Sequence, residues 1–157
     1  MPSATAELTS LPPELESARA VALSTQLPYA GGVTPPVAWR LLEAGEVQLV
    51  DVRTFEERKF VGHVPGSAHV AWATGTSLTR NPRFVRELEA KVGSKDATVL
   101  LLCRSGKRSA QAAEAAAKAG FTRVFNVLEG FEGEIDAQQH RGGADGWRFH
   151  SLPWVQD

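Results

Sequence analysis

The stretch LLLCRSGKRSAQAAEAAAKAG, residues 100–120, carries the strongest fold signal in the chain. It begins inside the apolar run ATVLLL at 97–102, which predicts a strand of a parallel sheet that is covered on both faces. A short basic turn, RSGKR, follows, and residues 109–119 are predicted to form a helix that ends at Gly120. A strand that runs through a tight turn into a helix is the repeating unit of α/β proteins.

The same alternation of strands and helices extends on both sides of this stretch. It predicts an α/β fold built on a parallel sheet, whose sites lie beyond the carboxyl ends of the strands. A further segment, 129–139, is predicted to begin as a loop and to turn helical. The remaining strands are predicted at 47–52, 68–71 and 124–127, and the remaining helices at 35–44 (N-cap Thr34), 55–60 (cap Thr54) and 81–92.

The chain divides into two predicted regions. Residues 1–32 carry four prolines and one helical pattern at 14–26, and we expect them to form an N-terminal extension that packs on the domain or on a partner. Residues 33–157 are predicted to form the domain. The 157 residues are 43% hydrophobic and 22% charged, which is ordinary for a globular protein with one core.

Composition also excludes several classes of function. The net charge of −1 carries no electrostatic footprint for nucleic acid. A single cysteine excludes an intramolecular disulfide and a multi-cysteine zinc site, and the four histidines show no metal-ligand spacing. The N-terminus is a poor signal peptide, and no run approaches the ~18 apolar residues of a membrane helix. We therefore expect a cytoplasmic protein with no metal, no cofactor, no nucleic-acid partner and no membrane contact.

The single cysteine, Cys103, lies between the predicted strand and helix. The turn that follows it is basic and contains a glycine, so its amides can curl into a nest, and the helix start adds partial positive charge. This environment favours the thiolate, which is the nucleophilic form of cysteine. The alternative is a small buried side chain that only packs, as free cysteines usually do. The basic turn favours the reactive thiol.

Charged residues at a second strand end are expected nearby. Asp51 and Arg53 follow the strand at 47–52, where they either orient the Cys103 loop or form an ion pair that holds the strand to the next loop. We favour the structural role. Glu56 and Glu57, in the first turn of the predicted short helix, are expected to be solvent exposed and to match the helix dipole.

Four segments of the chain form one ordered set: DVRTFEERKFVGHVPGSAHV at 51–70, LLLCRSGKRSAQAA at 100–113, NVLEGFEG at 126–133 and GWRFHSLPW at 146–154. Together they resemble the rhodanese family in the expected order, over residues 33–154. In the third of them Glu129 replaces the first of two glycines in the family's pattern. The resemblance implies a five-stranded parallel sheet with helices on both faces.

The resemblance also implies a function, the transfer of sulfur by a single-domain sulfurtransferase. Cys103 would take a sulfane sulfur from thiosulfate or from a persulfide, either a small molecule or a protein persulfide partner, and would pass it to a thiol or to cyanide. The protein would act as a monomer or homodimer. The loop Arg104, Ser105, Gly106, Lys107, Arg108 and Ser109 would bind the substrate, its amides holding the persulfide and its three basic side chains attracting the donor anion.

Two other functions remain open. Phosphatases related to this family have seven residues from the cysteine to the arginine, C-x5-R, because a tetrahedral oxyanion needs a wider loop. From Cys103 to Arg108 there are six, which favours sulfur over a Cys-dependent phosphatase or arsenate reductase. The third possibility is a non-catalytic binding module. The extension at 1–32 suggests it, because a minimal domain does not need these residues.

Overall fold

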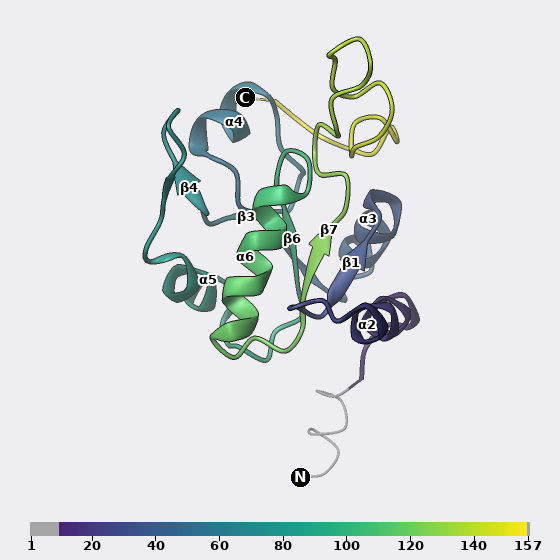
Figure 1. Cartoon of the computed structure of the whole chain (residues 1–157), viewed down its shortest axis with the longest axis vertical. Helices are drawn as coiled ribbons and strands as arrows, with labels where there is room; N and C mark the ends of the chain where they lie inside the picture. Colours follow the sequence, from purple (N-terminus) through teal and green to yellow (C-terminus); the bar gives the residue numbers. More distant parts are fainter. Residues whose placement is uncertain (1–9, 157) are drawn as a thin grey trace.

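The computed structural model describes residues 10–156, and a five-stranded parallel sheet forms its centre (Figure 1). The strand order is β1-β7-β6-β2-β3, and every neighbouring pair is parallel. A separate antiparallel hairpin pairs β4 with β5. The strands are β1 (Gly31–Val33), β2 (Gln48–Asp51), β3 (Ala68–His69), β4 (Ala73–Thr74), β5 (Thr79–Arg80), β6 (Val99–Leu102) and β7 (Val124–Val127).

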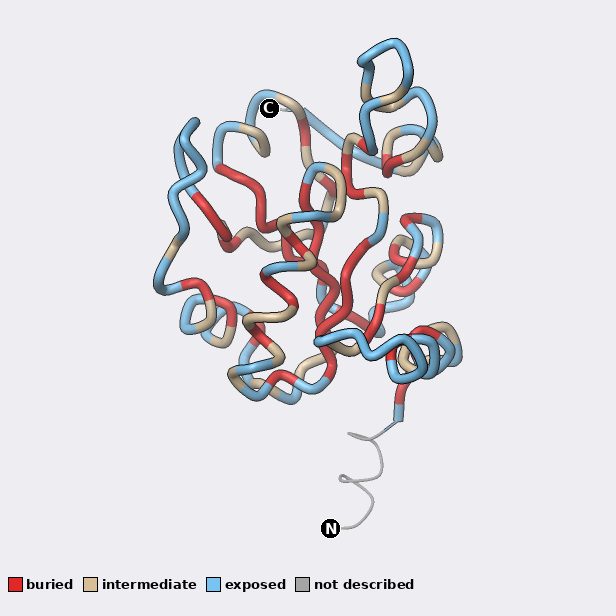
Figure 2. The backbone as a smooth tube through the Cα atoms, viewed as in Figure 1, coloured by how far each residue is buried: buried red, intermediate tan, exposed pale blue. Residues whose placement is uncertain are grey.

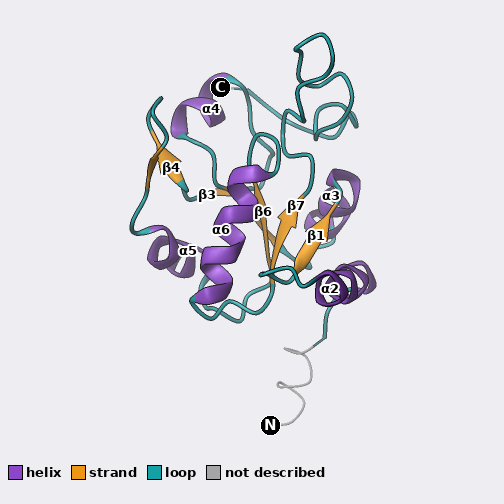
Figure 3. Cartoon of the chain, in the orientation of Figure 1, coloured by secondary structure: helices purple, strands orange, loops and turns teal. Residues whose placement is uncertain are grey.

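Helices cover both faces of the sheet, as Figure 3 shows. Alternate residues of β6 supply the two cores, so that Val99 and Leu101 pack toward α5 and α6 while Leu100 and Leu102 pack toward α2 and α3. All four are fully buried, and the buried backbone in Figure 2 follows the strands. The helices are α2 (Pro13–Thr25), α3 (Pro35–Glu43), α4 (Phe55–Phe60), α5 (Phe84–Val92) and α6 (Lys107–Lys118). The predicted α/β fold is confirmed.

The structure contains three strands that were not predicted: β4 and β5 form the separate hairpin, and β1 joins the central sheet. Strand β1 was not predicted, because its two glycines have no side chains of the kind that favour a strand. The predicted boundary between residues 32 and 33 falls inside β1, and the first nine residues of the predicted extension lie outside the described part. Helix α2 packs Leu15 and Ala18 into the core beside β1, so this part of the extension completes the domain.

Several local predictions were wrong in detail. Thr34 precedes α3, but its side chain makes no capping hydrogen bond. Two helix starts differ from the predicted ones, since α5 begins at Phe84, three residues later, and α6 begins at Lys107, two residues earlier. The segment 129–139 contains no helix, since Glu129, Gly130 and Gly133 all have positive φ values that a right-handed helix excludes. No helix between residues 10 and 156 has the length and apolar character needed to cross a membrane.

Candidate active site

Cys103 follows β6 directly and lies at the carboxyl edge of the sheet, where the sequence placed it. Its side chain is buried, and its Sγ accepts a hydrogen bond from the Gly106 amide at 3.1 Å. Gly106 is the N-cap of α6 and has φ +99°, a left-handed conformation that glycine adopts freely. The loop therefore turns so that the N-terminus of a 12-residue helix faces the sulfur. The partial positive charge of a helix N-terminus attracts anions, so the site suits an anionic substrate.

Ser109 and Asn126 hold the other side of the sulfur. The Ser109 Oγ lies 3.3 Å from the Cys103 Sγ and also contacts the Asn126 Oδ1. Because a hydroxyl has one proton, Ser109 donates to the asparagine or to the sulfur, and an anionic sulfur draws the proton toward itself. The Asn126 Nδ2 donates to the Gly106 carbonyl at 3.2 Å, which fixes the turn. No role was predicted for Asn126; the available signal was a polar residue inside the otherwise apolar strand pattern at 124–127.

The segment after β7 forms a wall against the loop. The carbonyl oxygens of Cys103 and Arg104 accept hydrogen bonds from the Phe131 and Glu132 amides at 2.8 and 2.9 Å. Gly130 has φ +70°, and a Cβ there would collide with the Arg104 backbone. The segment 126–133 thus supports the active loop through backbone contacts that only a glycine at position 130 permits.

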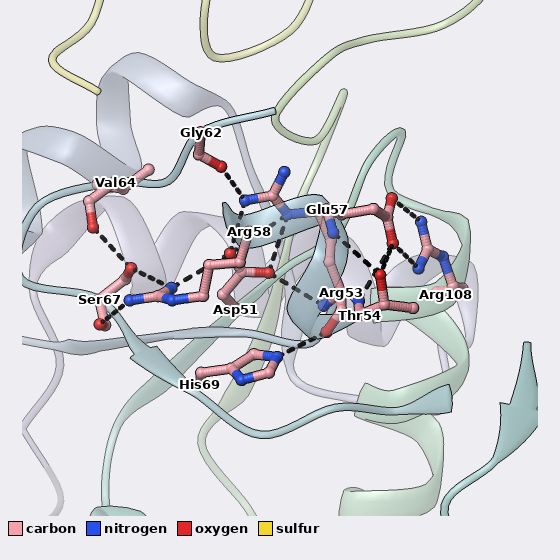
Figure 4. A network of polar contacts seen from close by, with 10 residues as sticks. All are labelled: Asp51, Arg53, Thr54, Glu57, Arg58, Gly62, Val64, Ser67, His69 and Arg108. Atoms are coloured by element: carbon pink, nitrogen blue, oxygen red, sulfur yellow. Dashed lines mark hydrogen bonds and ion pairs between the residues drawn. The ribbon is translucent and has the colours of Figure 1, made fainter. Parts of the chain in front are cut away.

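Arg108 forms an ion pair with α4, so the positive charge of the loop is smaller than predicted. It forms two hydrogen bonds to the Glu57 carboxylate, at 2.7 and 2.8 Å (Figure 4). Burial opposes the ionisation of Glu57, but the hydrogen bonds and charge of Arg108, with the Thr54 amide and Arg53, outweigh it and lower its pKa to about 2. The hydrogen bonds to Glu57 in turn raise the pKa of Arg108.

Two expectations about charge were therefore wrong. Glu57 is not a solvated side chain, because its side chain is only 19% exposed and completes both the Thr54 capping box and the ion pair. The loop does not offer three free cations either, since Glu57 compensates Arg108. Arg104 and Lys107 are exposed. The capping-box spacing from Thr54 was the only sequence signal for Glu57.

Asp51 and Arg53 form a fully buried ion pair at the end of β2 (Figure 4). The Arg53 guanidinium donates to the Asp51 carboxylate at 2.8 Å and to the Gly62 carbonyl, and it lies over the Phe131 ring. Arg58 adds a second contact to Asp51. Neither member of the pair hydrogen-bonds to the Cys103 loop within residues 10–156. The geometry supports the structural role over substrate contact.

A pocket of about 280 Å³ opens beside the loop. Arg104 and Arg108 form one wall, while Ser105, Gly106, Lys107 and Ser109 are not among the lining residues. The opposite walls come from α4 and from the β4–β5 hairpin, whose Leu78 is 44% exposed. The remaining lining residues are Thr54, Glu56, Glu57, Gly75 and Thr76. A larger apolar pocket of about 360 Å³ lies between α2 and α3, away from the thiol.

Comparisons with known proteins agree with this arrangement. The chain matches the model of the Rhodanese-like domain over residues 34–135. An uncharacterized protein of Rickettsia prowazekii is 37% identical over 109 residues, which are 68% of this chain and 80% of that protein. The chloroplastic thiosulfate sulfurtransferase 16 of Arabidopsis thaliana is 33% identical over 113 residues, 71% of this chain and 90% of its own length.

A solved structure extends the agreement to three dimensions. The crystal structure of Rv0390 from M. tuberculosis shares 44% identity and superimposes with a TM-score of 0.73, covering 82% of this chain and 99% of its own. The predicted resemblance and the five-stranded sheet with helices on both faces are confirmed. The chain belongs to the rhodanese-like family.

Proposed function

We propose that this protein is a sulfurtransferase that carries a sulfane sulfur on Cys103 as a persulfide. The observation that carries the proposal is the environment of the Cys103 Sγ, which the Gly106 amide and the Ser109 hydroxyl approach at 3.1 and 3.3 Å. Both groups donate hydrogen bonds to an anion, and the N-terminus of α6 adds positive potential. The name of the Arabidopsis relative supports the same reaction.

The reaction has two steps that return the enzyme to its starting state. The Cys103 thiolate attacks the outer sulfur of a donor, the sulfur–sulfur or sulfur–sulfonate bond of the donor breaks, and its electron pair leaves with a thiolate or with sulfite. An acceptor thiolate or cyanide then attacks the outer sulfur of the Cys103 persulfide. The Cys103–sulfur bond breaks, and its electron pair regenerates the thiolate.

Each residue of the site has a role in this proposal. Gly106 and Ser109 stabilise the anionic sulfur before and after transfer, and Asn126 holds both in place. Arg104 attracts the donor anion at the mouth of the pocket. The donor is a small persulfide or thiosulfate, and the acceptor is a small thiol, cyanide or a cysteine of a protein.

Mass spectrometry of the intact protein tests the proposal. Incubation with thiosulfate or a small persulfide should add about 32 Da, one sulfur atom, to the reactive thiolate. Cyanide or dithiothreitol should remove the adduct, and the matched variant Cys103→Ser should not form it. The absence of an adduct with every donor would contradict sulfur transfer. Hydrolysis of an aryl phosphate that depends on Cys103 would instead favour the phosphatase alternative.

A further inference from the structure

The pocket beside the Cys103 loop carries two opposite charges without a partner among residues 10–156. Arg104 extends from the active loop, and Glu56 lies in the first turn of α4; neither has an ion-pair partner in this part of the chain. The other two charges of the pocket, Arg108 and Glu57, neutralise each other. Among the side chains of residues 10–156 that line the pocket, a ligand therefore meets one free cation and one free anion.

These two charges come from different walls. Figure 1 shows α4 and the β4–β5 hairpin on the same side of the molecule as the start of α6, with Arg104 in the loop that leads into this helix. The hairpin adds the exposed apolar side chain of Leu78 and the hydroxyl of Thr76. At about 280 Å³ the pocket lies at the small end of ligand sites, which suits a molecule the size of an amino acid.

Thiosulfate uses only part of this arrangement. Its two negative charges are attracted by Arg104 but repelled by the exposed carboxylate of Glu56. A zwitterion with a persulfide uses all of it. Its carboxylate pairs with Arg104 and its ammonium with Glu56, and Arg104, which follows Cys103 directly in the chain, keeps the ligand next to the active loop.

Resting on the proposed sulfur transfer, we propose that this pocket selects the persulfide of a small α-amino thiol, of which cysteine is the simplest, as the sulfur donor. The Cys103 thiolate attacks the outer sulfur of R–S–S–H. The bond between the two donor sulfurs breaks, its electron pair leaves on R–S⁻, and Cys103–S–S–H forms. Glu56 sets specificity by binding the ammonium group, and Arg104 by binding the carboxylate.

Rates of Cys103 persulfide formation, followed by intact mass, test this assignment with three donors. The donors are the persulfides of cysteine, of 3-mercaptopropionate, which lacks the ammonium, and of cysteamine, which lacks the carboxylate. The leaving thiols of the three donors differ in reactivity. The readout is therefore the factor by which a substitution in the protein changes the ratio of the rates for two donors. Glu56→Gln should lower the cysteine-to-mercaptopropionate ratio about fivefold, the size expected of a charge pair in contact with solvent.

Two matched variants complete the experiment. Arg104→Gln should lower the cysteine-to-cysteamine ratio by a similar factor, and Glu16→Gln, an exposed site on α2, should leave both ratios as in the wild type. If Cys103 forms the persulfide but Glu56→Gln and Glu56→Ala leave the ratio unchanged, the assignment of the pocket is overturned and sulfur transfer stands. If no donor forms a Cys103 persulfide, sulfur transfer fails and the assignment fails with it.

Discussion

Replacing Glu57 by glutamine should lower the free energy of unfolding by about 2–3 kcal/mol at pH 7. The pKa of Glu57 falls from its ordinary 4.5 to about 2 in the folded protein. This difference of about 2.5 units, at 1.36 kcal/mol per unit, sets an upper figure of about 3 kcal/mol. Solvent screens the pair little, because the two side chains are only 14% and 19% exposed. Glutamine keeps the capping interaction with Thr54 and leaves Arg108 without its counter-charge.

The sign of the pH dependence follows from the lowered pKa. A carboxylate with a depressed folded-state pKa stabilises the protein fully above its unfolded pKa, and loses this contribution as the pH falls through the folded value. The stability gap between wild type and Glu57→Gln should therefore stay constant from pH 7 to about 5. It should shrink to roughly half near pH 3 and close below about pH 2.

Urea unfolding of both proteins at pH 7, 5, 4 and 3 measures this gap. Glu114→Gln is the matched control, since Glu114 forms an exposed pair with Lys118, 74% exposed, and should cost no more than about 0.5 kcal/mol. A gap at pH 7 as small as that of the control would refute the reasoning. A gap that does not change between pH 5 and pH 3 would refute it as well.

Three further substitutions test the support of the site. Ser109→Ala should slow persulfide formation at Cys103 about tenfold, because the sulfur loses one charge-assisted hydrogen bond; an unchanged rate in stopped-flow or mass assays would contradict this. Gly130→Ala should lower the free energy of unfolding by about 2–4 kcal/mol, since its Cβ meets the Arg104 backbone at φ +70°, and a wild-type denaturant midpoint would argue against the collision. Asp51→Ala should cost about 3–5 kcal/mol by leaving a buried guanidinium unpaired, which calorimetry can check, and a loss under 1 kcal/mol would be inconsistent with that burial.

Much of the fold could be predicted because local signals and packing agree. The apolar run before Cys103 becomes β6, the strand at 124–127 appears with its predicted bounds, and Thr54 caps a helix at Phe55–Phe60 as expected. In each case a local pattern and the tertiary environment favour the same structure. The place of Cys103 at the sheet edge follows from the same pattern, because a strand followed by a helix must end there.

Other features depend on contacts between distant segments. The two glycines of β1 form a strand only because β7 offers them a parallel partner. Arg108 meets Glu57 across 51 residues of sequence, and Asn126 reaches Gly106 across 20, so no local pattern reports either contact. The helix predicted within 129–139 does not form, because Gly130 and Gly133 adopt positive φ values and the amides of residues 131–133 donate hydrogen bonds to the active loop instead.

Glu129 shows how the chain departs from the family's sequence pattern without changing the backbone. It occupies a position where the pattern has glycine, and it keeps the left-handed backbone with φ 71° at a cost on the order of 1 kcal/mol. Its Oε1 accepts hydrogen bonds from the Gly146 amide at 3.0 Å and the His150 ring at 2.8 Å. These charge-assisted contacts offset the strain and join the wall of the active loop to the C-terminal segment, where Trp147 is fully buried. A glycine would adopt the same turn freely but would leave that segment without its carboxylate, so the departure supports the site by a different means.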